Sequence, residues 1–216
     1  LDHSRTNQRR DNPCVAHTDA DTLLLSSLAA ASTLLLVATL SPGPNNLVVL
    51  RTAAHGGIVA AWPAILGIVC GGIGLLVVAA AFGTRVSAWP QARSAIAIAG
   101  AAYLGWLGLC LLQARPGASA DAALPAGIAG LFCFQFLNPK SWVMALSLVA
   151  AFPPLGMVRT LAWLAPLFVL IPTASLLLWA VLGQQLSAYL HKPGLRRHID
   201  RIMGLALLAS AGLLLL

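Results

Sequence analysis

Long apolar stretches alternate with short polar segments along most of this sequence. Seven stretches contain no Asp, Glu, Lys or Arg, namely residues 22–50, 52–84, 94–114, 122–139, 141–158, 160–191 and 202–216. A helix needs about 20 apolar residues to cross a bilayer. The pattern therefore predicts six membrane-spanning helices, at about residues 23–50, 58–83, 94–113, 125–151, 160–186 and 199–216. The polar connections between them include Arg51–Gly57.

The first 21 residues differ from the rest of the chain. They are polar, show no regular periodicity, and lack the apolar core of a signal peptide. We therefore expect a polar, flexible tail at residues 1–21 and a membrane domain of six spans at residues 22–216.

Composition supports a membrane protein and excludes a soluble one. The 216 residues include 59% apolar and only 9% charged residues. About 25% of the residues in soluble domains are charged, so this chain has too few charges to cover a surface in water. We therefore predict an all-α integral membrane protein. The net charge of +7 comes from basic residues scattered between the spans, which is typical of membrane loops and not of a nucleic-acid-binding surface.

Two of the predicted spans contain helix-breaking sequences well inside their apolar runs. The first span contains Ser41–Asn46 (SPGPNN), and the fourth contains Gln135–Ser141 (QFLNPKS). Proline lacks an amide donor and clashes with the preceding helical turn. We therefore predict that the first and fourth helices are broken. The alternative is a pair of simple proline kinks, which membrane helices tolerate.

The two breaks indicate an internal repeat. Pro44 and Pro139 lie 95 positions apart, and the same offset carries the second and third predicted spans onto the fifth and sixth. The chain then consists of two halves of three spans each, at about residues 22–114 and 122–216. Because each half has an odd number of spans, the second must enter the membrane from the opposite side, as in the inverted repeats of secondary transporters.

The paired breaks also predict a central binding site. Unsatisfied backbone groups in hydrocarbon cost several kcal/mol each, so broken helices persist only where they are buried or line a wet cavity. We expect the helix after each proline to present free N–H groups and a positive dipole end, which suits a carboxylate. The candidate binding residues are Ser41, Gly43, Pro44, Asn45, Asn46, Gln135, Asn138, Pro139, Lys140 and Ser141.

Lys140 stands out because it is an ionisable residue inside a predicted span. A charge at the bilayer centre costs about 2.5–3.5 kcal/mol on insertion scales, so its side chain should face the interior of the helix bundle. There it would attract an anionic group or take part in proton coupling. The alternative is that Lys140 lies nearer the membrane surface and extends its ammonium into water.

The remaining residues offer little other chemistry. We expect no acidic side chain within the spans, and the histidines are dispersed, so we predict neither a metal site nor a cofactor. Ser41 and Lys140 would suit a Ser–Lys nucleophile pair. Nothing else in the sequence supports an enzyme, and we therefore predict no catalytic residue.

The motifs resemble those of one transporter family over about residues 23–216, namely the LysE/RhtB-type amino-acid exporters. The matching motifs are Ser41–Asn46 followed by His55–Gly57, Gly100–Leu104 with Trp106–Gly108, and Gln135–Lys140. The resemblance implies a bacterial inner-membrane protein with six spans that exports amino acids, driven by the proton-motive force. It also implies a homo-oligomer, and the fourth-span motif is most similar to that of the neutral-amino-acid, RhtB-like branch.

These observations lead to a mechanistic hypothesis of alternating access about a midplane site. The substrate carboxylate would meet the helix ends after Pro44 and Pro139 near Lys140, and Asn45, Asn46, Asn138 and Gln135 would bind its ammonium or side chain. One half would then rock against the other. The alternatives are a channel for small solutes and a membrane scaffold or assembly protein. The expected partners are an amino-acid substrate and the lipid bilayer, with no nucleic acid.

Overall fold

The described part of the chain is helical throughout, which confirms the all-α prediction. The structure is a computed structural model, and it describes residues 13–88, 90–113, 127–153, 155–190 and 193–213. Within these ranges there is no strand. The helices are α1 (Pro13–Leu40), α2 (Pro44–Ala88), α3 (Pro90–Gln113), α4 (Gly127–Leu137), α5 (Pro139–Ala151), α6 (Met157–Leu190) and α7 (Pro193–Leu213).

Three of the described helices are long and apolar enough to cross a membrane, which supports a membrane protein. Their spanning stretches are Thr22–Leu40, Pro44–Phe82 and Met157–Ser187. The apolar part of α3, Ala101–Gln113, is shorter, and the predicted fourth span is divided into α4 and α5. Neither half of that divided span reaches the length needed to cross alone. The arrangement of six spans in two inverted halves therefore stays a prediction.

The first helix begins earlier than expected. α1 starts at Pro13, so residues 13–21 of the predicted tail are helical, whereas residues 1–12 lie outside the described residues. Proline at the first helical position needs no amide partner, and its fixed φ already suits a helix. Extending an existing long helix costs much less than nucleating a new one, which explains why the polar segment continues it.

α2 reverses direction at one glycine. Gly57 has a φ of 76° and separates a first arm, residues 44–56, from a second arm, residues 58–88. A positive φ is strained for residues with a side chain, so glycine suits this position. Gln184 of α6 accepts a hydrogen bond from the Ile58 N–H at 3.0 Å. The predicted connection Arg51–Gly57 is therefore wrong in its extent, because the chain stays helical through Gly56.

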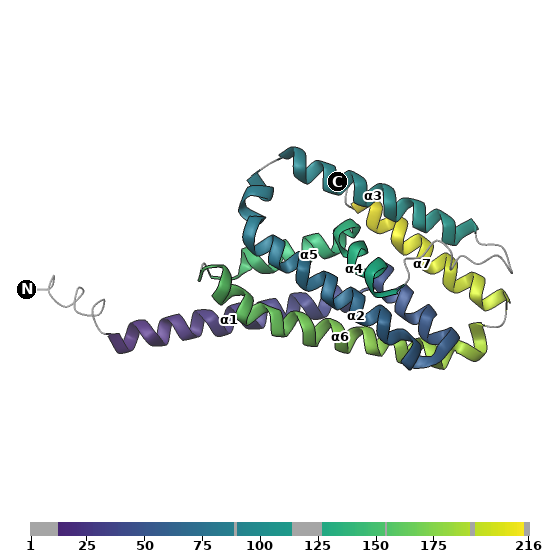
Figure 1. Cartoon of the computed structure of the whole chain (residues 1–216), viewed down its shortest axis with the longest axis horizontal. Coiled ribbons are helices and arrows are strands. Elements are labelled where there is room, and N and C mark those ends of the chain that lie inside the picture. The colour runs from purple at the N-terminus through teal and green to yellow at the C-terminus, as the bar shows by residue number, and fades with distance from the viewer. Residues whose placement is uncertain (1–12, 89, 114–126, 154, 191–192, 214–216) are drawn as a thin grey trace, which may run out of the picture.

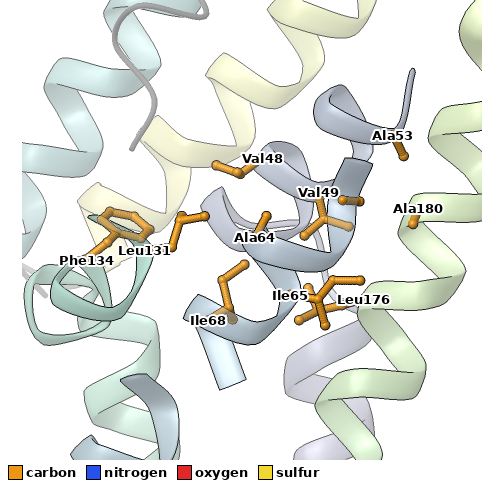
Figure 2. Close-up of a cluster of buried hydrophobic side chains, with 11 residues drawn as sticks. Val48, Val49, Ala53, Ala64, Ile65, Ile68, Leu131, Phe134, Leu176 and Ala180 are labelled. Atoms are coloured by element: carbon orange, nitrogen blue, oxygen red, sulfur yellow. The ribbon is translucent and has the colours of Figure 1, made fainter. Parts of the chain in front are cut away.

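α2 is the central element of the packing. It contacts α6 most extensively and also lies against α4 and α5, whereas α3 packs on α7 along one side (Figure 1). In the main apolar cluster, Val48 and Val49 of the first arm meet Ile65 and Ile68 of the second arm (Figure 2). Leu131 and Phe134 of α4 and Leu176 and Ala180 of α6 complete this cluster.

Glycine allows α6 to approach the first arm of α2 closely. A Cβ atom at Gly183 would lie 2.1 Å from the carbonyl oxygen of Leu50, which is far inside contact distance. We expect Gly183→Ala to lower the stability of the detergent-solubilised protein by about 1–3 kcal/mol, because the two helices must separate. Thermal unfolding followed by size-exclusion chromatography measures the change.

Gly130→Ala is the matched control for this substitution. Gly130 also lies inside a helix, and a Cβ there meets nothing within 4 Å. Alanine favours helix over glycine by about 1 kcal/mol, so this variant should be as stable as the wild type or slightly more stable. Equal melting temperatures for both variants would contradict the close approach of α6 to α2.

Candidate binding site

The two predicted helix breaks are present. α1 ends at Leu40 and α2 begins at Pro44, with residues 41–43 outside either helix. α4 ends at Leu137 and α5 begins at Pro139, so Asn138 alone separates them. In both cases proline is the first residue of the new helix, where its missing N–H costs no intrahelical hydrogen bond. The prolines therefore determine where each helix restarts.

Asn46 bridges the first break. Its side-chain amide donates hydrogen bonds to the carbonyl oxygens of Thr39 at 3.0 Å and Ser41 at 2.8 Å. Leu47 N–H also donates to the Gly43 carbonyl at 3.0 Å. Asn46 is 4% exposed, so its amide takes the place of water at the end of α1. The side chain holds α1 and α2 together across the gap.

Asn138 closes the second break as a hydrogen-bond acceptor, whereas Asn46 closes the first as a donor. Its side-chain oxygen accepts a hydrogen bond from the Lys140 N–H at 3.1 Å, and its carbonyl accepts from Ser141 N–H at 3.0 Å and Trp142 N–H at 3.3 Å. These bonds use the N–H groups of the first turn of α5. The expectation of free N–H groups after Pro139 is therefore wrong, because Asn138 is an N-cap.

The start of α2 lacks such a cap. Within the described residues, no hydrogen-bond partner meets the backbone N–H of Asn45 or Asn46. Both N–H groups belong to the first turn of α2, whose amides carry the partial positive charge of the helix dipole. The prediction of unbonded N–H groups at the start of a helix therefore agrees with the structure at the first break, after Pro44. It does not agree at the second break, after Pro139.

Polar side chains connect the two breaks directly. Asn45 and Gln135 exchange a pair of amide hydrogen bonds, at 3.0 and 3.1 Å, between residues 90 positions apart in the sequence. Ser141 Oγ donates to the same Gln135 oxygen at 2.9 Å. Gln135 is only 1% exposed, and its amide also donates to the Leu131 carbonyl at 3.1 Å. This network fixes the first arm of α2 against α4 and α5.

Lys140 also joins the two breaks. Its ammonium donates hydrogen bonds to the carbonyl and to the hydroxyl of Ser41, each at 2.8 Å. The Ser41 hydroxyl in turn donates to the Ala38 carbonyl at 2.9 Å. Because Lys140 donates to Ser41 and the Ser41 proton points elsewhere, this pair is not arranged for Lys140 to act as a base. The contact holds a positive charge in a fixed position.

A cavity lies between the breaks and two further helices. Its volume, counted with its open mouth, is about 540 Å³. Eight of the ten candidate residues line it, namely Gly43, Pro44, Asn45, Asn46, Gln135, Asn138, Lys140 and Ser141. Of the other two, Ser41 is exposed and bonded to Lys140, and Pro139 is buried at the start of α5. The geometry therefore brings the candidate residues together.

The apolar wall of the cavity was not predicted. It is formed by Ala38, Ile68, Val69, Gly72, Met144, Phe168, Pro172 and Leu176, together with the Thr39 side chain. A Cβ at Gly72 would lie 2.6 Å from Cε1 of Phe168, so glycine leaves space there for the aromatic ring. Pro172 suggests a bend in α6, but a bend alone does not identify a cavity wall.

A buried ion pair lies outside this cavity and corrects two expectations. Arg51 of α2 forms a salt bridge with Asp200 of α7, and both side chains are buried. Arg51 was expected in a connection, but it is helical. The spans were expected to hold no acidic side chain, but Asp200 lies within both the predicted span 199–216 and α7. The sequence alone gives no signal for this pairing, because the two residues are 149 positions apart.

Comparison with known proteins gives one family and a group of relatives. Residues 36–216 match the family described as LysE type translocator. A cysteine/O-acetylserine efflux protein of Escherichia coli (strain K12) is 25% identical over 188 residues, which cover 85% of this chain and 95% of that protein. The protein of the same name from Klebsiella pneumoniae is 26% identical over 160 residues, covering 72% and 81%. No solved structure matches the chain.

The two capping asparagines predict opposite responses to aspartate. Asn46 acts as a donor, so Asn46→Asp should leave two carbonyls unpaired, at about 1–3 kcal/mol for each, and add a repelling charge. Asn138 acts as an acceptor at a helix N-terminus, where aspartate caps equally well. We expect Asn46→Asp to lower the melting temperature far more than Asn138→Asp in matched detergent samples. Equal losses would contradict the assigned hydrogen-bond directions.

Proposed function

This chain belongs to the LysE type translocator family, and we propose that it is a secondary active transporter that exports small neutral amino acids or close derivatives, driven by the proton-motive force. The family consists of transporters and not of enzymes. The observation that carries the proposal is a cavity between two broken helices that holds one fixed ammonium group. We propose that the transporter crosses the bacterial inner membrane.

The proposed carboxylate site combines Lys140 with the open start of α2. Lys140 Nζ lies close to Gly43, at 3.1 Å from the position that a Cβ atom would take there. Gly43 shortly precedes Asn45 and Asn46 in the sequence, whose N–H groups belong to the first turn of α2. Charge-assisted hydrogen bonds and a helix N-terminus both favour a carboxylate. Since the N–H groups after Pro139 are already bonded, the backbone N–H groups of the proposed contact come from the first break alone. Gln135 Oε1 already accepts hydrogen bonds from Asn45 and Ser141. The side-chain oxygens of Asn45 and Asn138 each accept one hydrogen bond, and each would accept a second from the substrate ammonium.

The lining of the cavity supports a neutral substrate side chain. Lys140 is the sole charged residue among those that line it, and no carboxylate is present there to pair with a cationic side chain. Met144, Phe168 and Leu176 offer apolar surface instead. Cysteine and O-acetylserine, the compounds in the names of the E. coli and Klebsiella relatives, have small neutral side chains. We therefore propose substrates of this class, as expected of the RhtB-like branch.

We further propose that the chain folds as two inverted repeats of three spans. The contact of α3 with α7 supports this symmetry. A Cβ at Gly108 would lie 2.9 Å from the Gly204 carbonyl and 3.0 Å from Leu208, and a Cβ at Gly204 would lie 2.9 Å from the Gly108 carbonyl and 3.0 Å from Leu112. The contact is thus reciprocal, and its partners are offset by 96 positions. The prolines at the two breaks are offset by 95.

This symmetry suits alternating access. In repeat transporters, one half rocks against the other around a site where broken helices meet. A channel would instead need a continuous pore, and a scaffold would need no polar network in its centre. The homo-oligomer suggested by the family resemblance stays a prediction.

Export of a defined substrate tests the proposed function. Bacteria that express the chain should release cysteine or O-acetylserine faster than vector controls, and an uncoupler should abolish the difference. Lys140→Met should lower this export about ten- to hundredfold, because it removes a charge-assisted bond to the carboxylate worth about 1.5–3 kcal/mol. Mass spectrometry of the medium measures the export.

Val143→Met is the matched control for Lys140→Met. Val143 lies on the same helix, is 56% exposed, and does not line the cavity. It should export at the wild-type rate when membrane levels are equal. Normal export by Lys140→Met would refute the proposed carboxylate site, whereas no export of any amino acid by the wild type would refute the transport function.

Reporter fusions test the second to fifth of the proposed six spans. Alkaline phosphatase, which is active only outside the cytoplasm, would be fused after residues 56, 88, 120, 155 and 191. Six spans require the activity to alternate between high and low from one position to the next. Two neighbouring positions with the same activity would show that the segment between them does not cross the membrane.

A further inference from the structure

The buried ion pair of Arg51 and Asp200 connects the cavity wall to α7. The first arm of α2 contributes Asn45 and Asn46 to the cavity, and Arg51 lies on the same short helix. The Arg51 and Asp200 side chains are only 8% and 7% exposed. They lie beside an apolar cluster that includes Leu47, Leu50, Met203 and Leu207. Two charges are therefore held away from water between two helices.

The C-terminal part of the first arm and the elbow that follows it make two further contacts with α6. Gly183 allows the Leu50 carbonyl to approach closely, and Gln184 binds the Ile58 N–H. The first arm and the start of α7 lie at the same end of the molecule (Figure 1). The ion pair thus belongs to the set of contacts that hold this end of the first arm in place. A helix transmits displacement along its axis, so release at Arg51 would also move Asn45 and Asn46.

The ion pair has no counterpart in the other half of the chain. The offsets of 95 and 96 positions place Leu146 opposite Arg51 and Leu104 opposite Asp200. Both leucines contribute to apolar clusters. A contact needed only for folding could be apolar in both halves, and replacing a buried ion pair by apolar residues is often neutral or stabilising. Charge in one half only indicates a role that apolar residues cannot perform.

Asp200 is the carboxylate best placed for such a role. After residue 21 the sequence contains only Asp121 and Asp200 as acidic residues, and Asp121 lies outside the described residues. A transporter that couples to protons needs a group that gains and loses a proton during its cycle. Buried carboxylates in membrane helices commonly serve this purpose.

We propose that Asp200 is the binding site of the coupling proton, and that Arg51 is its counter-ion. One proton joins the Asp200 carboxylate, the acid becomes neutral, and its salt bridge with Arg51 is lost, which releases the first arm of α2 from α7. Loss of the proton to the other side of the membrane restores the salt bridge. This proposal rests on the proposed function as a proton-driven exporter and assigns its coupling site.

The other charged and titratable side chains of α2 and α7 that the structure describes near the pair are exposed. On α2, His55 is exposed and its Nδ1 lies 2.8 Å from the Arg51 carbonyl. On α7, Arg197, His198 and Arg201 are exposed. On α3, the titratable residues with described side chains are Tyr103 and Cys110. The described side chains at this end of α6 include no charged group. Asp200 is therefore the acidic group here whose protonation changes a buried contact.

Purified protein in liposomes separates coupling from transport. Exchange of ³⁵S-labelled cysteine against unlabelled cysteine at equal pH, with a reductant present, needs a working cavity but no proton movement. Accumulation of cysteine driven by a pH gradient needs both. The wild type should perform both reactions. A wild type that performs neither reaction with cysteine or with O-acetylserine would refute the proposed substrates, and this outcome is distinct from a failure of Asp200.

The double variant Arg51→Gln/Asp200→Asn removes both charges and leaves none unpaired. We expect it to keep exchange within about twofold of the wild type and to lose at least 90% of the accumulation driven by the pH gradient. Asp200→Glu, which keeps the acid, should retain that accumulation. A purely structural ion pair predicts instead that the double variant keeps both reactions if it folds and loses both if it does not. Gradient-driven accumulation by the folded double variant would therefore overturn the proposal.

Chemical modification of the wild type covers the case in which the double variant does not fold. A hydrophobic carbodiimide reacts with buried carboxyl groups in their protonated form. We expect an adduct at Asp200 by mass spectrometry, with accumulation lost and exchange retained. Absence of an adduct at every pH, or accumulation by protein that carries the adduct, would overturn the proposal. Lys140→Met should lose both reactions, which distinguishes the substrate site from the coupling site.

Discussion

A helix that breaks within an apolar helix bundle leaves peptide groups without partners, and this constraint shapes the centre of the molecule. The end of α1 has carbonyls that need donors, and Asn46 supplies them from its amide. The start of α5 has N–H groups that need acceptors, and Asn138 supplies them. The same residue type thus meets opposite demands. Because only the second helix start is capped, the N–H groups of Asn45 and Asn46 give the cavity one distinct positive end.

Neither break is completed by its own segment. Lys140 comes from the second break, and its ammonium is held by the carbonyl and hydroxyl of Ser41 in the first. Asn45 comes from the first break and pairs with Gln135 of α4. The cavity therefore exists only when the two parts of the chain are packed together, and a change at one break alters the other. This mutual dependence also gives the Lys140 ammonium polar partners, since the break that exposes the Ser41 carbonyl also provides an acceptor for the charge.

The sequence predicts the breaks because proline has a local effect that needs no tertiary context. It also predicts their proximity, since paired breaks in apolar spans must be buried together, and eight of the ten candidate residues line one cavity. It does not predict the cap at Asn138, because capping depends on a side-chain orientation. It also misses Arg51 with Asp200, because a charge between apolar runs is typical of a loop unless a distant partner compensates it. The wall formed by Phe168 and Pro172 is likewise invisible, since apolar residues in a span are the default.

The first arm of α2 relates these features to each other. Its start forms the positive end of the cavity, its middle carries Arg51, and its end is the glycine elbow at Gly57. The elbow at Gly57 interrupts the helix between the first arm and the long second arm, so the two arms are separate helical segments. α5 begins at the second break in the same way, but an N-cap closes its start and it has Leu146 where the first arm has Arg51. Two helices that both begin at a proline therefore differ in the capping of their first turn and in the residue at their middle. A substrate carboxylate and a coupling proton would both act on the first arm.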